Sequence, residues 1–521
     1  MGERVLDFYK DSIKKEYKIA FIFTFIITLL VHLYKFTNAL PNNDSVINYY
    51  SNQNIIGSGR WALSFACGFS SYYDLPWIIG LFSCVFIALT TVVIVALFKV
   101  KNPVVIGLIG ALIGTSPATT ETFFFLFTAD GYMIAMLLAA LGVYFTRIEE
   151  KRYIFMFLSI FCICVSCGIY QAYLSFALVL SLCYFIDIIF QNVYSKKDCT
   201  RWIVKQIIVY SISLLLYFLI WKLLMLITGT APNDYQGISK VGHLNFNLIY
   251  NGIISSISTV LLFFTKADTL KDGLTAYTVI NILFIILMFI ILVKAFFKSK
   301  VYLRKWATVL VVLSLICVIP FACIWCFTSD SVVYRAMMLQ SLTILIVYTV
   351  ILLEKYAGFK TKNLACLFFV VMILNNSFIA NINYFYLNLS YENTYAEGLE
   401  IAMKIHELQD NYKFDKIASF GIRMESVEFK LKDTVTNKYI NANKDFVYGK
   451  RIDRSLIKST EKLSNFIDIN YGIKLKPVNE KDRSRIMKSK DFKEMKYWPS
   501  KESMRVIDDT LVIKFKDEYL N

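Results

Sequence analysis

The chain contains 521 residues, of which 57% are hydrophobic and only 18% are charged. Soluble domains carry about 25% charged residues, so this composition excludes a soluble protein and predicts a polytopic helical membrane protein. The net charge of +16 does not indicate nucleic-acid binding, because most of the excess lies beside apolar segments, where membrane topology explains it.

Long apolar runs recur along the first three quarters of the chain, and each could cross a bilayer core of about 30 Å. The first run follows the charged stretch "MGERVLDFYKDSIKKEYK" without a signal-peptide cleavage site, so we interpret it as a retained span. The sequence predicts eleven spans, at residues 18–36, 76–98, 103–116, 131–146, 153–168, 172–190, 204–228, 275–297, 305–327, 337–354 and 364–383.

Lys and Arg concentrate in alternate connections between these runs, for example in "TRIEEKR", "YSKKDCTRWIVK" and "KAFFKSKVYLRK". Because cytoplasmic loops carry such an excess, we expect the N-terminus to lie inside the cell. The first outer loop (37–75), a long outer loop (229–274) and the C-terminal tail then lie outside.

The composition changes after about residue 384, where the long apolar runs stop. The segment "YENTYAEGLEIAMKIHELQD" predicts a helix with one apolar face. "KIASFGI" and "MRVIDDTLVIKF" predict strands, the second divided into a pair by an Asp-Asp turn. We therefore expect a transmembrane domain at 1–384 and a small α/β domain at 385–521 on the outer face.

Cysteine and histidine give no sign of a metal site or of a nucleophile with its base. Most of the 11 Cys lie inside apolar runs such as "FCICVSC", and the chain has only 3 His. The sequence contains no Gly-rich phosphate loop, GxSxG motif or HExxH motif. We expect no metal ion and no cofactor.

Ionisable and polar residues gather at the predicted outer ends of the spans, where such groups are candidates for function. Asp44, Glu121 and Asp130 are the candidate catalytic residues, since a carboxylate can act as a general base toward a hydroxyl group. Arg and Lys can stabilise the charge of a leaving phosphate, so the set suits sugar transfer from a lipid phosphate. The candidate substrate-binding residues are Arg60, Trp61, Tyr170, Gln171, Lys222, Lys240, Lys266 and Arg335.

The candidates also have structural interpretations. "PNND" is typical of a turn, so Asp44 could simply form local hydrogen bonds. Glu121 and Asp130 could cap the helices that start beside them. Arg335 could pair with the nearby Asp330.

Several segments resemble the Gtr-type integral-membrane glucosyltransferases of the GT-C superfamily, which include the serotype-converting O-antigen enzymes. They are the acidic residue followed by "GRW" in the first outer loop, "IYQAYLSF", "SDSVVYRAMM" and "YWPSKESMRVIDDTLVIKF". The resemblance implies a GT-C-like bundle in a bacterial cytoplasmic membrane and inverting transfer of a single sugar, by default glucose. It implies a polyprenyl-phosphate-linked donor and a surface glycan acceptor, such as O-antigen, cell-wall polysaccharide or teichoic acid.

The resemblance also implies a role for Asp44, because related enzymes use an acidic residue of the first outer loop as the general base. Many GT-C relatives carry paired acidic residues in that loop, whereas "PNNDSVIN" supplies one, and Asp74 lies far along the loop. Either Asp44 acts alone, or Glu121 or Asp130 shares the task. A single carboxylate also disfavours a bound divalent metal.

Two other classes of membrane protein remain as alternatives. A flippase or transporter for lipid-linked oligosaccharides would be expected to show two similar halves, and no internal repeat is evident. A polysaccharide polymerase would be expected to carry an Arg-rich outer loop, whereas the loop 229–274 contains no Arg.

Overall fold

The computed structural model describes residues 13–233, 246–265, 275–328, 332, 334–421 and 455–515. The candidates Lys240 and Lys266 lie outside these residues. The described chain divides into two compact units. The first unit comprises 13–37 and 51–381, and the second comprises 38–50 and 382–515.

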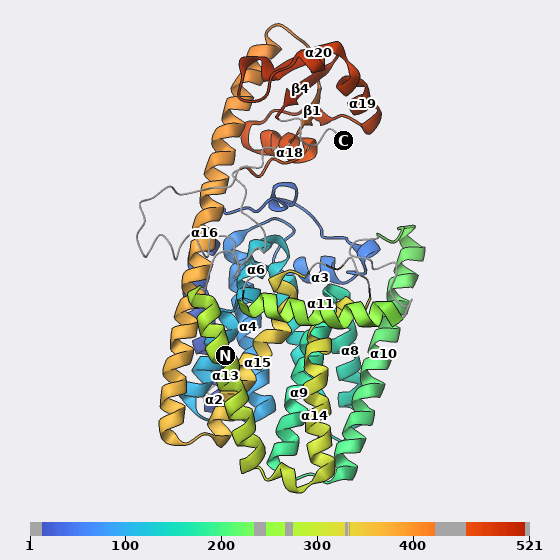
Figure 1. The fold of residues 1–521 in the computed structure, drawn as a ribbon. Coiled ribbons are helices and arrows are strands. Elements are labelled where there is room, and N and C mark those ends of the chain that lie inside the picture. The colour runs from blue at the N-terminus through green and yellow to red at the C-terminus, as the bar shows by residue number, and fades with distance from the viewer. Residues whose placement is uncertain are drawn as a thin grey trace, which may run out of the picture. The chain divides into compact units, whose positions relative to one another are not determined.

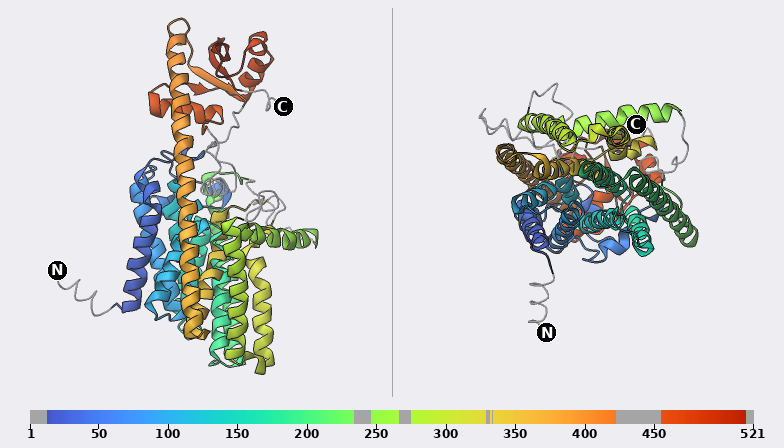
Figure 2. Two further views of the ribbon diagram at one scale, coloured as in Figure 1. Left: turned by 60° about the vertical axis from the view of Figure 1, so that its left-hand side comes forward. Right: turned by 90° about the horizontal axis from the view of Figure 1, so that it is seen from below.

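The first unit is a bundle of long apolar helices (Figure 1; Figure 2, right). In the part of the chain that the structure describes, ten helices are long and apolar enough to cross a membrane, and the bent pair α5–α6 could be an eleventh. The chain is therefore a polytopic helical membrane protein, and a helix occupies each of the predicted runs. Including the shorter ones, the main helices of this part of the chain are α2 (Lys15–Thr37), α4 (Pro76–Phe98), α5 (Pro103–Gly114), α6 (Pro117–Phe124), α7 (Ala129–Phe145), α8 (Tyr153–Ile169), α9 (Tyr173–Gln191), α10 (Lys196–Thr228), α11 (Phe246–Thr265), α13 (Ala276–Lys298), α14 (Lys305–Ala322), α15 (Gln340–Tyr356) and α16 (Phe359–Gln409).

Local sequence explains the bend between α5 and α6. Ser116 caps α6 by accepting a hydrogen bond from the N–H of Thr119, and Pro117 stands at the first helical position. A proline there starts a new helix but cannot continue the preceding one. The two helices are bent by 40° at this break, which leaves α6 as a short helix in its own direction.

Small residues allow α5 to pack closely on α2. A Cβ atom built on Gly110 would overlap the Thr24 hydroxyl, and one built on Gly114 would overlap the Thr28 hydroxyl. Both contacts are spaced four residues apart on each helix, so they lie on one face. Glycine at such spacings permits the close backbone approach that stabilises helix pairs in membranes.

Helix α11 differs from its neighbours because it runs crosswise to the long helices α10, α13 and α14 (Figures 1 and 2). It lies within the segment 229–274, which the sequence alone presents as a loop. Although this helix is one of the ten that are long and apolar enough to cross a membrane, its residues divide into three faces, a pattern typical of a helix in the membrane interface. Leu248, Gly252 and Ser256 are buried, Ile249, Ile253, Ile257 and Leu261 form an exposed apolar face, and Asn247, Asn251, Ser255 and Ser258 form an exposed polar face.

The last helix of the bundle, α16, is longer than predicted because it joins two predicted elements. It runs for 51 residues, from the predicted span at 364–383 through the predicted helix that begins at Tyr391. The connecting stretch "YFYLNLS" contains neither glycine nor proline, so nothing in it interrupts the backbone hydrogen bonds. One helix is therefore shared by the two units.

The second unit contains a four-stranded sheet in the order β2-β1-β4-β3. Strand β1 pairs in parallel with β2 and β4, and β3 and β4 form an antiparallel hairpin. The structure thus confirms the predicted strands and the Asp-Asp turn, at which Asp508 has a φ of 55°. The elements are β1 (Lys416–Phe420), β2 (Lys476–Pro477), β3 (Met504–Ile507) and β4 (Thr510–Lys514), with helices α18 (Thr460–Tyr471), α19 (Glu480–Lys488) and α20 (Lys490–Glu494).

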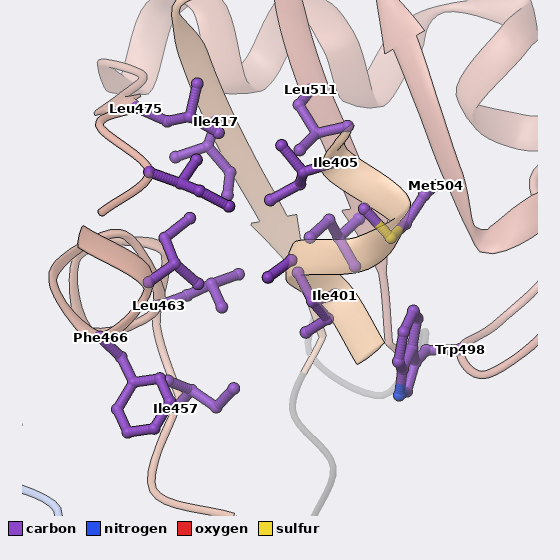
Figure 3. Close-up of a cluster of buried hydrophobic side chains, with 14 of the residues drawn as sticks. Ile401, Ile405, Ile417, Ile457, Leu463, Phe466, Leu475, Trp498, Met504 and Leu511 are labelled. Carbon is purple, nitrogen blue, oxygen red and sulfur yellow. The ribbon is translucent and has the colours of Figure 1, made fainter. Parts of the chain in front are cut away.

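Apolar side chains cover both faces of this sheet, as the two-residue alternation of strands requires. On one face, Ile417 and Leu511 pack with residues of α16 and α18 (Figure 3). On the other, Ala418 and Val512 pack with residues of α19 and α20. The second unit therefore has a core of its own.

Candidate active site

The loop that joins α2 to α4 is divided between the two units. Residues 38–50 belong to the second unit, and residues 51–75 belong to the first. The candidates Asp44 and Arg60, which are 16 positions apart in the chain, are therefore held by different parts of the fold.

The turn "GSGRW" at 57–61 is fixed by polar side chains of the bundle. Gln171 Nε2 donates a hydrogen bond to the Ser58 carbonyl at 2.8 Å, and the Tyr217 hydroxyl donates to the Gly59 carbonyl at 3.1 Å. Gly59 has a φ of 79°, a conformation that favours glycine, and a Cβ atom there would overlap the Tyr217 hydroxyl. The turn therefore needs this glycine, and it sets the position of Arg60.

Arg60 lies on a stack of two tyrosines. Its Nη1 donates to the Tyr132 hydroxyl at 3.2 Å, and its guanidinium carbon lies 4.8 Å from the centre of the Tyr170 ring. The rings of Tyr132 and Tyr170 are stacked with centres 4.3 Å apart. This arrangement fixes the orientation of the cation.

Two other candidates, Trp61 and Lys222, have contacts with neighbouring residues of the bundle. The Trp61 ring fills the space beside Gly168, where a Cβ atom would lie only 2.5 Å from it. Lys222 is exposed on α10, with its Nζ 5.6 Å from the centre of the Trp221 ring. Neither contact by itself indicates a substrate.

Glu121 is a fully buried carboxylate on α6. Its Oε2 accepts a hydrogen bond of 2.7 Å from the N–H of Met337 in the short helix η7 (Ala336–Leu339). A second contact lies beside it, because Gln340 Nε2 at the start of α15 donates to Thr119 Oγ1 of α6 at 3.0 Å. Glu121 therefore fixes η7 against α6.

Arg335 immediately precedes η7 and lies within electrostatic range of Glu121. Its guanidinium carbon is 5.0 Å from the centre of the Phe125 ring. The predicted partner Asp330 lies outside the described residues. The structure thus brings together two residues, Glu121 and Arg335, that are more than 200 positions apart in the chain.

An aromatic contact connects the Arg60 group with α6. Tyr170 packs edge-on against Tyr173, with ring centres 6.0 Å apart. The Tyr173 hydroxyl lies beside Thr122, which follows Glu121 on α6. Tyr173 therefore connects the Arg60 group with the helix that carries Glu121.

Asp130 has different surroundings from Glu121. Its Oδ1 accepts a hydrogen bond of 2.8 Å from the N–H of Gly131, and it lies beside Ser70 and Cys67. It is almost fully buried. Asp130 therefore faces the short helix α3 (Leu63–Cys67) and the residues after it, rather than η7.

Asp44 is the most accessible of the candidate carboxylates. Its side chain is 40% exposed and forms an ion pair of 3.3 Å with Lys462 of α18. Glu121 is 0% exposed and Asp130 is 1% exposed. Of the three, Asp44 is the carboxylate that a substrate can reach in this conformation.

Lys35 and Asp74 form a further charged group that the sequence analysis did not assign to the site. Lys35 is buried in the last turn of α2, and Asp74 precedes α4. Burial raises the pKa of Asp74 to about 6, although the nearby positive charge of Lys35 partly offsets the rise. The signal was present in the sequence, since Lys35 is a cation inside a predicted span.

The comparison with known families decides the identity of the chain. The model of the family "Glucosyl transferase GtrII" matches residues 33–354, which is more than half of the chain. The chain belongs to the GtrII glucosyl transferase family. This membership confirms the Gtr-type resemblance and supports a role in glucosyl transfer.

The part that matches the GtrII family contains every candidate residue, from Asp44 to Arg335. It ends before the second unit resumes at residue 382. No curated protein and no solved structure matches the chain.

Proposed function

We propose that this GtrII family member transfers a glucosyl residue from a polyprenyl-phosphate donor to a bacterial surface glycan. The transfer would take place on the outer side of the cytoplasmic membrane, with inversion at the anomeric carbon, in a GT-C-like bundle. The observation that carries the proposal, beyond family membership, is that side chains of the bundle hold both Arg60 and Arg335 in a set orientation.

The two arginines suit the phosphate of such a donor. Arg60 is oriented by Tyr132 and Tyr170, and Arg335 by Glu121 and Phe125. A guanidinium group offers planar, paired donors that match phosphate oxygens. Cations that are fixed before the reaction stabilise the charge that develops on a leaving phosphate. We assign Arg60 and Arg335 to binding the donor phosphate.

The surroundings of Glu121 suit a positioning role rather than that of a base. It is fully buried, and a backbone N–H already occupies one of its oxygens. A general base must come within hydrogen-bond distance of the hydroxyl group that it deprotonates. Glu121 would therefore act by holding η7 and Arg335, and Asp130 by holding the segment around Ser70.

Asp44 is our candidate for the general base. In the proposed step, the acceptor oxygen forms a bond to the anomeric carbon while the bond between that carbon and the phosphate oxygen breaks. Asp44 takes the proton of the acceptor hydroxyl, and polyprenyl phosphate leaves with the bonding electrons. A single displacement of this kind inverts the anomeric carbon, and it does not need protonation of the leaving group.

The proposal can be tested by measuring donor consumption in nanodiscs. The donor is undecaprenyl-phosphate-glucose, the acceptor is a crude bacterial glycan, and the variants are Arg60→Lys and Arg335→Lys. We expect each variant to raise the donor KM, because lysine keeps the charge but loses the paired geometry. Arg152→Lys is the control, since its exposed ion pair with Glu150 involves none of the candidates.

Failure of the wild-type protein to consume this donor would contradict the proposed function. Flipping of a lipid-linked glycan by the same preparation would then favour the transporter alternative.

A further inference from the structure

The segment that carries Asp44 is part of the core of the C-terminal domain. Val46 is 0% exposed and belongs to the same apolar cluster as Ile401, Leu463 and Phe466. These partners belong to α16 and α18, and each of the three lies more than 350 positions further along the chain than Val46. Residues 38–50 accordingly group with the second unit and not with the helical bundle.

One face of α18 makes the polar contacts to this segment. The Asn465 side chain donates to the Val46 carbonyl, and Lys462 Nζ donates to Asp44 Oδ1 at 3.3 Å. Lys462, Asn465 and Phe466 are spaced three and four residues apart, so they lie on the same side of the helix. Apolar, backbone and charged contacts thus converge on Asp44 and Val46.

The segment is also rigid in itself. Asn42 Oδ1 accepts hydrogen bonds from the N–H groups of Asp44 and Ser45, both at 2.8 Å. Asn48 Nδ2 donates to the Asp44 carbonyl at 2.8 Å. The backbone of Asp44 is therefore held from both sides, while its side chain remains partly exposed.

We propose that the C-terminal domain positions the general base of this enzyme. Val46 anchors the segment in the domain core, and Lys462 and Asn465 are positioning residues that orient Asp44. This inference rests on the proposed role of Asp44. It assigns a catalytic contribution to a domain that lies beyond the residues matching the GtrII family.

The proposal can be tested with two variants of the full chain in nanodiscs. Val46→Asp places a charge in the apolar cluster, and Lys462→Met removes the ion pair at similar side-chain length. We expect Val46→Asp to raise hydrogen exchange of 38–50 and to lower kcat about 100-fold, since a displacement of about 1 Å can have such an effect. We expect Lys462→Met to lower kcat about 10-fold and Lys462→Arg to restore most of it, because only the latter keeps the charged contact.

Lys416→Met provides a matched control. Lys416 forms an ion pair of 2.6 Å with Asp509 in the same domain, and this pair makes no contact with the Asp44 segment. We expect this variant to keep the wild-type kcat and exchange. If Val46→Asp fails to fold, Val46→Ala replaces it, with a smaller change in the same direction.

The outcomes separate this inference from the assignment of the base. Wild-type exchange of 38–50 in Val46→Asp would overturn the docking, and faster exchange with a wild-type kcat would overturn the positioning role. If Asp44→Asn is inactive while Val46→Asp and Lys462→Met are fully active, the base assignment stands and the positioning role is wrong. If Asp44→Asn is fully active, the base assignment is wrong, and this inference falls with it.

Discussion

Glu121 makes its contacts with residues that lie far away in the sequence. Its carboxylate binds the N–H of Met337 and attracts Arg335. Glu121→Gln keeps the size of the side chain but removes the charge, and a hydrogen bond to a charged group is worth about 1.5–3 kcal/mol. We expect kcat/KM for the donor to fall by about 10- to 100-fold, since about 1.4 kcal/mol corresponds to a factor of ten. Donor turnover checks this, and unchanged kinetics would contradict the positioning role.

Asp74 predicts a dependence of stability on pH. Its pKa is raised to about 6 in the folded protein, so folding favours the protonated carboxyl. This contribution to stability is complete below the ordinary pKa of Asp and is lost as the pH rises through about 6. We therefore expect the Tm of the wild type, relative to that of Asp74→Asn, to fall as the pH rises from about 4 to about 7. A difference in Tm that stays constant over this range would contradict the raised pKa.

Sequence patterns could identify some of these residues but not their contacts. Asp44, Glu121, Asp130 and Arg335 stand out because ionisable groups beside apolar runs are unusual. The contact between Glu121 and η7 could not be predicted, because it depends on how helices distant in the chain pack. Tyr132 and Tyr217 were missed because an aromatic residue in a predicted span is ordinary.

At the scale of single elements, the close packing of α5 on α2 predicts a difference between two glycines. A methyl group at Gly110 would overlap the Thr24 hydroxyl, whereas one at Gly107 would lie 3.4 Å from the Phe23 ring, an ordinary contact. We expect Gly110→Ala to lower the Tm in detergent and Gly107→Ala to leave it nearly unchanged, because overpacking costs about 1–3 kcal/mol. Equal effects of the two substitutions would contradict the close approach.

The three faces of α11 predict a pattern of accessibility to a membrane-impermeant maleimide. Asn251 lies on the exposed polar face and Ile253 on the exposed apolar face. In nanodiscs, we expect Asn251→Cys to react and Ile253→Cys to be protected, because the apolar face of an interfacial helix lies in lipid. Labelling is counted above that of the wild type. Equal reaction of both variants would contradict an interfacial position for α11.

The helices were easier to predict than their arrangement. Apolar runs locate them because every span must be long and apolar. The sequence does not predict α11, because its Asn and Ser residues interrupt the apolar pattern. It predicts α16 as two separate elements, because the composition changes midway although the helix continues without a break.

At the scale of the whole molecule, the second unit is assembled from segments that are far apart in the chain. Composition separates the polar tail from the apolar runs. It does not reveal that residues 38–50 pack with that tail, because this packing depends on the burial of a single valine, Val46, and on contacts to α18. A short polar segment between two spans carries too few apolar residues to signal which core it joins.

The turnover of Asp44→Asn tests the central claim most directly. Wild type and variant are compared in nanodiscs with undecaprenyl-phosphate-glucose and a glycan acceptor, and Asp509→Asn serves as the control because Asp509 also pairs with a lysine of the same domain. Loss of a general base lowers kcat by about 10²- to 10⁴-fold, so we expect a loss of that size for Asp44→Asn and none for the control. Full turnover by Asp44→Asn would contradict the account.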